Sequence, residues 1–218
     1  MGRPSVGGRP LFVDLQTTGT AVSSSLLIQL DEESDDDPIL NLATFFANDH
    51  PIEVELGFGK GRFLLDAAQR RPAHNFIGVE VASKYLRLAH GRARRRELQN
   101  LRFIHGDARE FVEFFVPAES VHAVHVYFPD PWPKKKHHKR RLIDAGFLSE
   151  AWRILQPEGR LWIATDHDEY YEVILEAFES FDQHFDLIEA PWNGVTTNYE
   201  DKFVSLGSTI HRHIVAKI

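Results

Sequence analysis

The chain has 218 residues, of which 43% are hydrophobic, enough for one domain with a sizeable core. It contains no cysteine, which excludes disulfides, thiolate metal sites and cysteine nucleophiles. No stretch is long and apolar enough to span a membrane, and the first ten residues lack the apolar run of a signal peptide. We therefore expect a cytoplasmic protein with no membrane partner.

The charged residues are unevenly distributed along the chain. The formal net charge of −7 argues against a nucleic-acid partner, but six of the carboxylates lie in segment 31–37, and the charge without them is −1. Five arginines lie in segment 87–96, and six lysines and arginines lie in segment 134–141. Because salt screens charges beyond about 8 Å, such local clusters decide what a phosphate backbone meets.

The composition divides the chain into two parts. Residues 1–37 are rich in Gly, Pro, Ser, Thr and acidic residues and predict an N-terminal arm with an acidic linker. In residues 38–218, which we expect to form the main domain, apolar runs alternate with segments of helical periodicity. We expect strands at 52–58, 75–81, 101–107, 121–128 and 160–166, and helices at 41–49, 61–71, 83–98, 108–115, 145–155 and 168–180.

This alternation predicts an α/β fold, a mostly parallel sheet with helices on both faces. The last two expected strands, 184–190 and 208–218, are joined by a segment without helical periodicity, so we expect them to pair antiparallel. The resulting seven-stranded layout resembles the class I methyltransferase fold, which is Rossmann-like. At the helix starts, Ser83 is the predicted N-cap of one helix and Asp168 that of another.

Acidic residues fall where four of the predicted parallel strands end. Ligands of such sheets bind at these carboxyl ends. Glu80 can accept hydrogen bonds from both hydroxyls of a ribose, and Glu55 can pair with the ammonium of a methionine moiety. Asp107 can accept from an adenine amino group, with Ala108 leaving room for the ring. Together these three predict an S-adenosylmethionine site, and Asp130 is the acid that follows the fourth strand.

A glycine loop follows the first of these strands. Gly57, Gly59 and Gly61 let the backbone turn tightly and approach a ligand. The dinucleotide-binding pattern would need Gly or Ala at position 62, where Arg62 stands, and a P-loop would need Ser or Thr after Gly-Lys. Taken alone, the loop could be an ordinary strand-to-helix turn.

The strongest motif is FPDPWPKKKHHKRR at 128–141. Three prolines within six residues exclude a helix there and stiffen the loop around Asp130. Trp132 can pack this loop or stack on a base. The cations that follow can neutralise phosphates. The alternative for the motif is a rigid loop with a solvated tail.

At this motif the chain resembles the bacterial tRNA (guanine-N7)-methyltransferase family, and the resemblance covers roughly residues 50–218. It implies methyl transfer from S-adenosylmethionine to a guanine in the tRNA variable loop, position 46 in tRNA numbering. N7 of guanine carries a lone pair and no proton, so no general base and no metal are required. The resemblance implies that Asp130 lines the S-adenosylmethionine site and is the catalytic residue. There it would place negative charge where the purine becomes cationic.

The resemblance also assigns contacts with the tRNA. Lys134 and Asp166 are implied to contact the substrate, and the T-x-x-E loop of the family matches residues 197–200, with Asn198 standing where the family often has a basic residue. The substrate loop is formed by Thr197, Asn198, Tyr199 and Glu200, and the RNA-contacting segment by Lys136, His137, His138, Lys139, Arg140 and Arg141.

Other interpretations stay open. The chain could methylate another RNA, a protein or a small molecule, or could be a non-catalytic RNA-binding protein on the same fold. An NAD-dependent oxidoreductase is excluded by Arg62. Arg92–Arg96 can be a solvated helix face or can contact RNA. Asp166 and Asp168 have the spacing of a metal pair, but a strand end and a helix cap explain them better. A monomer or a homodimer without another obligate partner is expected.

Overall fold

The computed structural model describes residues 39–189, 200, 204, 207 and 209–218. The predicted arm at 1–37 lies outside these residues. The strands are β1 (Ile52–Leu56), β2 (Asn75–Glu80), β3 (Leu101–His105), β4 (Val121–Tyr127), β5 (Leu155–Thr165), β6 (Phe185–Leu187) and β7 (His211–Lys217). The α-helices are α1 (Arg62–Arg70), α2 (Ser83–Arg95), α3 (Ala108–Glu110), α4 (Ala145–Ile154) and α5 (Asp168–Glu179). Short helical segments of other types are η1 (Leu42–Phe45), η2 (Phe111–Phe115) and η3 (Lys135–Arg140).

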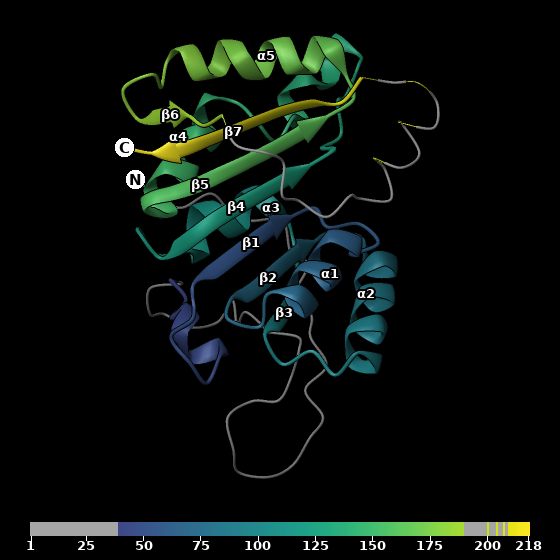
Figure 1. The fold of residues 1–218 in the computed structure, drawn as a ribbon. Coiled ribbons are helices and arrows are strands. Elements are labelled where there is room, and N and C mark those ends of the chain that lie inside the picture. Colours follow the sequence, from purple (N-terminus) through teal and green to yellow (C-terminus); the bar gives the residue numbers. More distant parts are fainter. Residues whose placement is uncertain (1–38, 190–199, 201–203, 205–206, 208) are drawn as a thin grey trace, which may run out of the picture.

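The seven strands form one sheet in the order β3-β2-β1-β4-β5-β7-β6 (Figure 1). β1 to β5 are parallel, whereas β7 runs antiparallel to both β5 and β6. Every residue of β1 and β2 is buried, as expected for strands covered on both faces. The prediction of a mostly parallel sheet with a terminal antiparallel pair is confirmed.

Helices cover both faces of the sheet (Figure 1). α1 and α2 pack beside each other on β2, and α2 also contacts β3. Their apolar residues share one hydrophobic cluster with Phe76, Phe103 and Tyr127. The second cluster joins the other face of the sheet to η1, η2, α4 and α5. None of the helices of the described part is long and apolar enough to cross a membrane.

Several local predictions were wrong. The helix expected at 41–49 is only the short turn η1, and the strand expected at 184–190 is reduced to the three residues of β6. Ser83 is not the N-cap of α2: Ala82 is, and the Ser83 hydroxyl lies 3.0 Å from Nε2 of His105. α5 is capped by His167, whose Nδ1 accepts the Tyr170 amide at 3.2 Å, and not by Asp168.

Candidate active site

The site is built at the carboxyl edge of the sheet. Because β1 to β4 are parallel and in register, their carboxyl ends meet at one edge. Glu55 lies near the end of β1 and Glu80 is the last residue of β2. Asp107 follows β3, and Asp130 follows β4 by three residues. The topology therefore brings all four predicted carboxylates to the same edge.

Glu55 is held in an unsatisfied state. Its side chain is only 4% exposed, and its Oε2 has no hydrogen-bond partner among the described residues. Burial, together with the negative charge of Glu80, raises the pKa of Glu55 to about 8, and a hydrogen bond from the Leu64 amide offsets only part of this. A buried polar oxygen without a partner is costly, so this position fits a carboxylate that meets a cationic ligand.

The glycine loop is shaped by the neighbouring acid. Gly57, Gly59 and Gly61 all have positive φ, at 72°, 53° and 71°. The Gly59 amide donates to Oε2 of Glu80 at 2.8 Å. A Cβ added to Gly57 would meet no atom within 4 Å, so open space lies beside this backbone. The loop thus leaves room for a ligand beside Gly57.

Glu80 and Asp107 accept hydrogen bonds from backbone amides at this edge of the sheet. Oε1 of Glu80 accepts the Ala82 amide at 2.8 Å, so this carboxylate joins the glycine loop to the start of α2. Oδ1 of Asp107 accepts the amides of Arg109 and Glu110 at 2.8 and 3.2 Å and caps α3. A carboxylate oxygen has more than one acceptor site, and both side chains keep acceptor capacity for hydroxyl or amino groups of a ligand.

Asp130 is presented by a stiff loop. It lies between Pro129 and Pro131, is exposed, and makes no hydrogen bond or ion pair with another described residue. Phe128 and Trp132 on either side have left-handed backbone conformations, with φ of 53° and 43°. Such strained positions cluster at functional sites, because the surrounding structure must hold them.

The basic segment divides into exposed and buried cations. Lys134, which precedes η3, is exposed, as are Lys136 and Lys139. Arg140 is also exposed, with its guanidinium carbon 5.0 Å from the centre of the Trp132 ring. His137 and His138 are half-buried; the ring of His137 lies 5.7 Å from that of Trp132, and Nε2 of His138 lies 3.7 Å from Oε1 of Glu169.

Arg141 differs from the other cations of the segment. It is 4% exposed, and its guanidinium donates to the Pro131 carbonyl at 2.8 Å and to Glu169 at 3.0 Å. It also lies 4.9 Å from the centre of the Tyr170 ring. The expectation that Arg141 contacts RNA does not agree with this burial. Its contacts fix the proline loop against α5.

The remaining predicted contacts are only partly described. Asp166 lies directly after β5 and is half-buried. Glu200 is 4% exposed and forms an ion pair with Arg212 of β7. Thr197, Asn198 and Tyr199 lie outside the described residues. Among the residues that the structure describes, no group of three or more His, Asp or Glu side chains could hold a metal ion.

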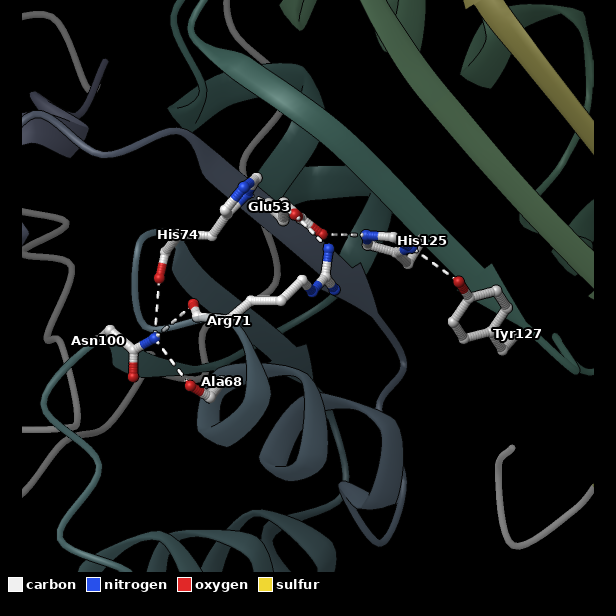
Figure 2. A network of polar contacts seen from close by, with 7 residues as sticks. All are labelled: Glu53, Ala68, Arg71, His74, Asn100, His125 and Tyr127. Atoms are coloured by element: carbon white, nitrogen blue, oxygen red, sulfur yellow. Dashed lines mark hydrogen bonds and ion pairs between the residues drawn. The ribbon is translucent and has the colours of Figure 1, made fainter. Parts of the chain in front are cut away.

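Sequence reasoning missed a buried polar network behind the site. The Glu53 carboxylate lies 2.6 Å from Nη1 of Arg71, in the turn after α1, and 2.8 Å from Nε2 of His125 on β4. Figure 2 shows both contacts. Nδ1 of His74 lies 2.8 Å from the same carboxylate, and Nδ1 of His125 lies 2.7 Å from the Tyr127 hydroxyl. Part of the signal was present in the sequence as Glu53 and Glu55 at alternate positions of an otherwise apolar strand.

The network has a defined charge state. Burial raises the pKa of Glu53, but the contacts with His125, Arg71 and His74 outweigh it and lower the pKa to about 2. Burial lowers the pKa of His125 and keeps it neutral, and burial with the nearby charge of Glu55 raises the pKa of Tyr127. His125 therefore donates from Nε2 to Glu53 and accepts the Tyr127 hydroxyl at Nδ1.

Comparisons with solved structures agree with this architecture. The structure of TrmN from Thermus thermophilus matches with a TM-score of 0.56 and 22% identity, over 79% of this chain and 45% of that chain. The aminoglycoside resistance methyltransferase NpmB1 matches with a TM-score of 0.55 and 20% identity, over 79% of this chain and 89% of that chain. The fold, with its glycine loop and edge carboxylates, defines a class I methyltransferase.

Sequence comparisons narrow the class. The family described as "Putative methyltransferase" matches residues 49–213. A tRNA (guanine-N(7)-)-methyltransferase from Geobacillus sp. (strain WCH70) is 36% identical, over 77% of this chain and 78% of the relative. Another from Enterococcus faecalis is also 36% identical, over 77% of this chain and 80% of the relative. The chain belongs to the tRNA (guanine-N7-)-methyltransferase family.

Proposed function

We propose that this protein transfers the methyl group of S-adenosylmethionine to N7 of a guanine in the tRNA variable loop, position 46. Family membership supports the reaction and the tRNA. The structural observation that carries the proposal is Asp130, which is exposed, without a partner among the described residues, and held by prolines at the edge where Glu55, Glu80 and Asp107 converge.

The residues present fit the methyl donor. The unpaired oxygen of Glu55 suits the ammonium of the methionine moiety. The raised pKa of Glu55 means that its negative charge is unfavourable when no cation lies beside it. Glu80 would hold the ribose hydroxyls, and Asp107 with Ala108 the adenine. Gly57 and Gly59 allow close approach of the backbone. When bound, S-adenosylmethionine supplies an activated methyl group on a sulfonium.

The protein's contribution to the reaction is alignment and electrostatics. N7 needs no deprotonation, so a general base is unnecessary. Asp130 places a carboxylate beside the purine as it becomes cationic, and the loop keeps that carboxylate in position without reorganisation. Arg141 positions this loop through the Pro131 carbonyl.

The contacts with the tRNA phosphates are assigned to exposed cations of the same edge. Lys136, Lys139 and Arg140 would neutralise phosphates. Half-buried His137 and His138 would lie at the border of this surface. The substrate-binding residues remain Lys134, Asp166, Thr197, Asn198, Tyr199 and Glu200. We further propose a cytoplasmic enzyme that acts as a monomer or homodimer without another obligate protein partner.

Two tRNA transcripts test the proposal. The purified protein is incubated with S-adenosylmethionine labelled in its methyl group and with an unmodified tRNA, or with the same tRNA carrying adenine at position 46. We expect N7-methylguanosine in the first digest and no label in the second. Label in both would place the methylated guanine elsewhere. Binding of both tRNAs without transfer would favour a non-catalytic RNA-binding protein.

A further inference from the structure

The outer face of α2 carries a row of cations. At 100° per residue, Leu86, Ala89 and Ala93 point to one side, and all three are buried. The opposite side is exposed and holds four basic residues. We call it the α2 face, and it consists of Lys84, Arg87, Arg94 and Arg95. The helix SKYLRLAHGRARR contains no acidic residue.

Several other arginines in the described part of the chain have a partner within the protein, which these four cations lack. Arg71, Arg109 and Arg153 each form an ion pair with a carboxylate, at 2.6, 2.9 and 2.6 Å. Arg96, directly after the helix, pairs with Asp66 at 2.7 Å. No residue of the α2 face has a hydrogen bond or ion pair with any other residue in the described part of the chain.

Helix stability does not explain the first two cations. The amino end of a helix favours negative charge, and the first turn of α2 holds Lys84 but no acid. Lys84 and Arg87, three positions apart, are like-charged neighbours, which disfavours the helix. Arg94 and Arg95 at the carboxyl end do suit the helix dipole. Two of the four cations therefore have no role in helix stability, and the row presents positive charge that an external anion can meet.

The α2 face is continuous with the donor site. The helix begins directly after Ala82, whose amide donates to Glu80 at 2.8 Å, and runs beside α1 (Figure 1). Arg92 on its flank donates to the Lys60 carbonyl of the glycine loop at 3.1 Å. Lys60 is itself exposed, so cations extend from the reactive edge along the length of α2.

We propose that the α2 face binds the sugar-phosphate backbone of the tRNA, away from the methylated guanine. This inference rests on the proposed function, which supplies the polyanion. From Lys84 to Arg95 the helix rises about 16 Å, enough to meet several successive phosphates. Flexible cations on one face, without base-reading amides or aromatic rings among them, fit contacts that are independent of sequence.

A pair of matched double variants tests this. R87Q/R95Q removes two charges from the α2 face. R70Q/R160Q removes two exposed charges at the amino edge of the sheet, where α1 ends and the parallel part of β5 begins. Affinity for an unmodified tRNA is measured by fluorescence anisotropy between 50 and 200 mM KCl. Binding of S-adenosylmethionine and thermal unfolding are measured in parallel as folding controls.

We expect R87Q/R95Q to bind tRNA about tenfold more weakly, with the slope of log K against log salt reduced by about two. Donor affinity should be unchanged, and R70Q/R160Q should behave as the unaltered protein. Equal tRNA affinity and salt slope in the two double variants would overturn the inference while leaving the proposed function intact. Failure of the unaltered protein to bind or methylate tRNA would overturn both.

Discussion

Strand β1 carries two buried glutamates that have opposite surroundings. Glu53 and Glu55 are two residues apart on the same side of the strand, with 2% and 4% of their side chains exposed. Glu53 lies in the middle of a network with Arg71, His74 and His125 (Figure 2), and its pKa is lowered to about 2. Glu55 keeps an oxygen without a partner, and its pKa is raised to about 8.

The two glutamates show that buried carboxylates are paired in the interior of the sheet and unpaired at its carboxyl edge. Inside the sheet, a buried carboxylate is fully paired and contributes to stability. At the carboxyl edge, only two residues further along β1, one oxygen of Glu55 has no partner among the described residues. This lack of a partner is a cost to the protein without ligand, and a cationic ligand can remove it. Asp130 at the same edge also has no partner in the described part, but it is exposed to water and its charge carries no such cost.

The largest effect is expected at Asp130. Asp130→Ala should lower the single-turnover rate of methyl transfer about 100-fold or more, because a preorganised charge beside the developing cation is lost. Thermal stability should stay unchanged, since Asp130 makes no hydrogen bond or ion pair with other described residues. S-adenosylmethionine should still bind, through Glu55, Glu80 and Asp107. A rate near that of the unaltered protein would remove Asp130 from the mechanism.

The next effect concerns stability. Glu53→Gln should lower the free energy of unfolding at pH 7 by about 3 kcal/mol, because it breaks a buried charged network. Glu176→Gln on the exposed side of α5 is the control and should change it by less than about 0.5 kcal/mol. Since the folded-state pKa of Glu53 is depressed, its contribution is present above pH 4.5 and is lost as the pH falls toward 2. Urea unfolding at several pH values measures both; equal losses in the two variants would contradict the network's role.

Glu55 should show the opposite pH dependence. Its raised pKa means that the folded protein keeps a proton which the unfolded chain releases, so stability without ligand falls as the pH rises from 4.5 to 8. Between pH 6 and 8 this amounts to about 2 kcal/mol. Glu55→Gln should lack this fall, and urea unfolding of both proteins at the two pH values checks it. Parallel curves would show that Glu55 is already ionised.

A smaller effect is expected at Arg141. Arg141→Lys cannot reproduce both guanidinium contacts, to Pro131 and Glu169, so the loop that carries Asp130 should be less well positioned. We expect kcat to fall about tenfold while KM for tRNA stays unchanged. Lys139→Gln, at an exposed cation, should instead raise KM for tRNA. A raised KM with normal kcat in Arg141→Lys would return this residue to the RNA-binding surface.

Much of the fold could be predicted because its signals are local. Buried parallel strands appear as short apolar runs, and the acids at their ends marked the edge of the sheet. Ser83 and Asp168 were mistaken for N-caps because their propensity is strong, whereas contacts of Ser83 with His105 and of His167 with the Tyr170 amide decided the outcome. Tertiary packing overrides propensity at such positions.

The residue types of the site could be predicted from the sequence, but not which of its residues are buried and which are exposed. The six lysines and arginines of segment 134–141 look alike in the sequence. Only the packing against α5 shows that Arg141 is buried while Lys139 is exposed. The partners of Glu53 come from β4 and from the turn after α1, so its network could not be deduced from β1 alone.

Calorimetric titration with S-adenosylmethionine tests most directly whether Glu55 is reserved for the ligand. Titrations at pH 7 in two buffers with different ionisation enthalpies give the number of protons released on binding. We predict that the unaltered protein releases about one proton, because Glu55 loses its proton when the ammonium of the ligand binds beside it. Glu55→Gln should bind S-adenosylmethionine more weakly and release no proton. Equal affinity and equal proton release in the two proteins would contradict this prediction.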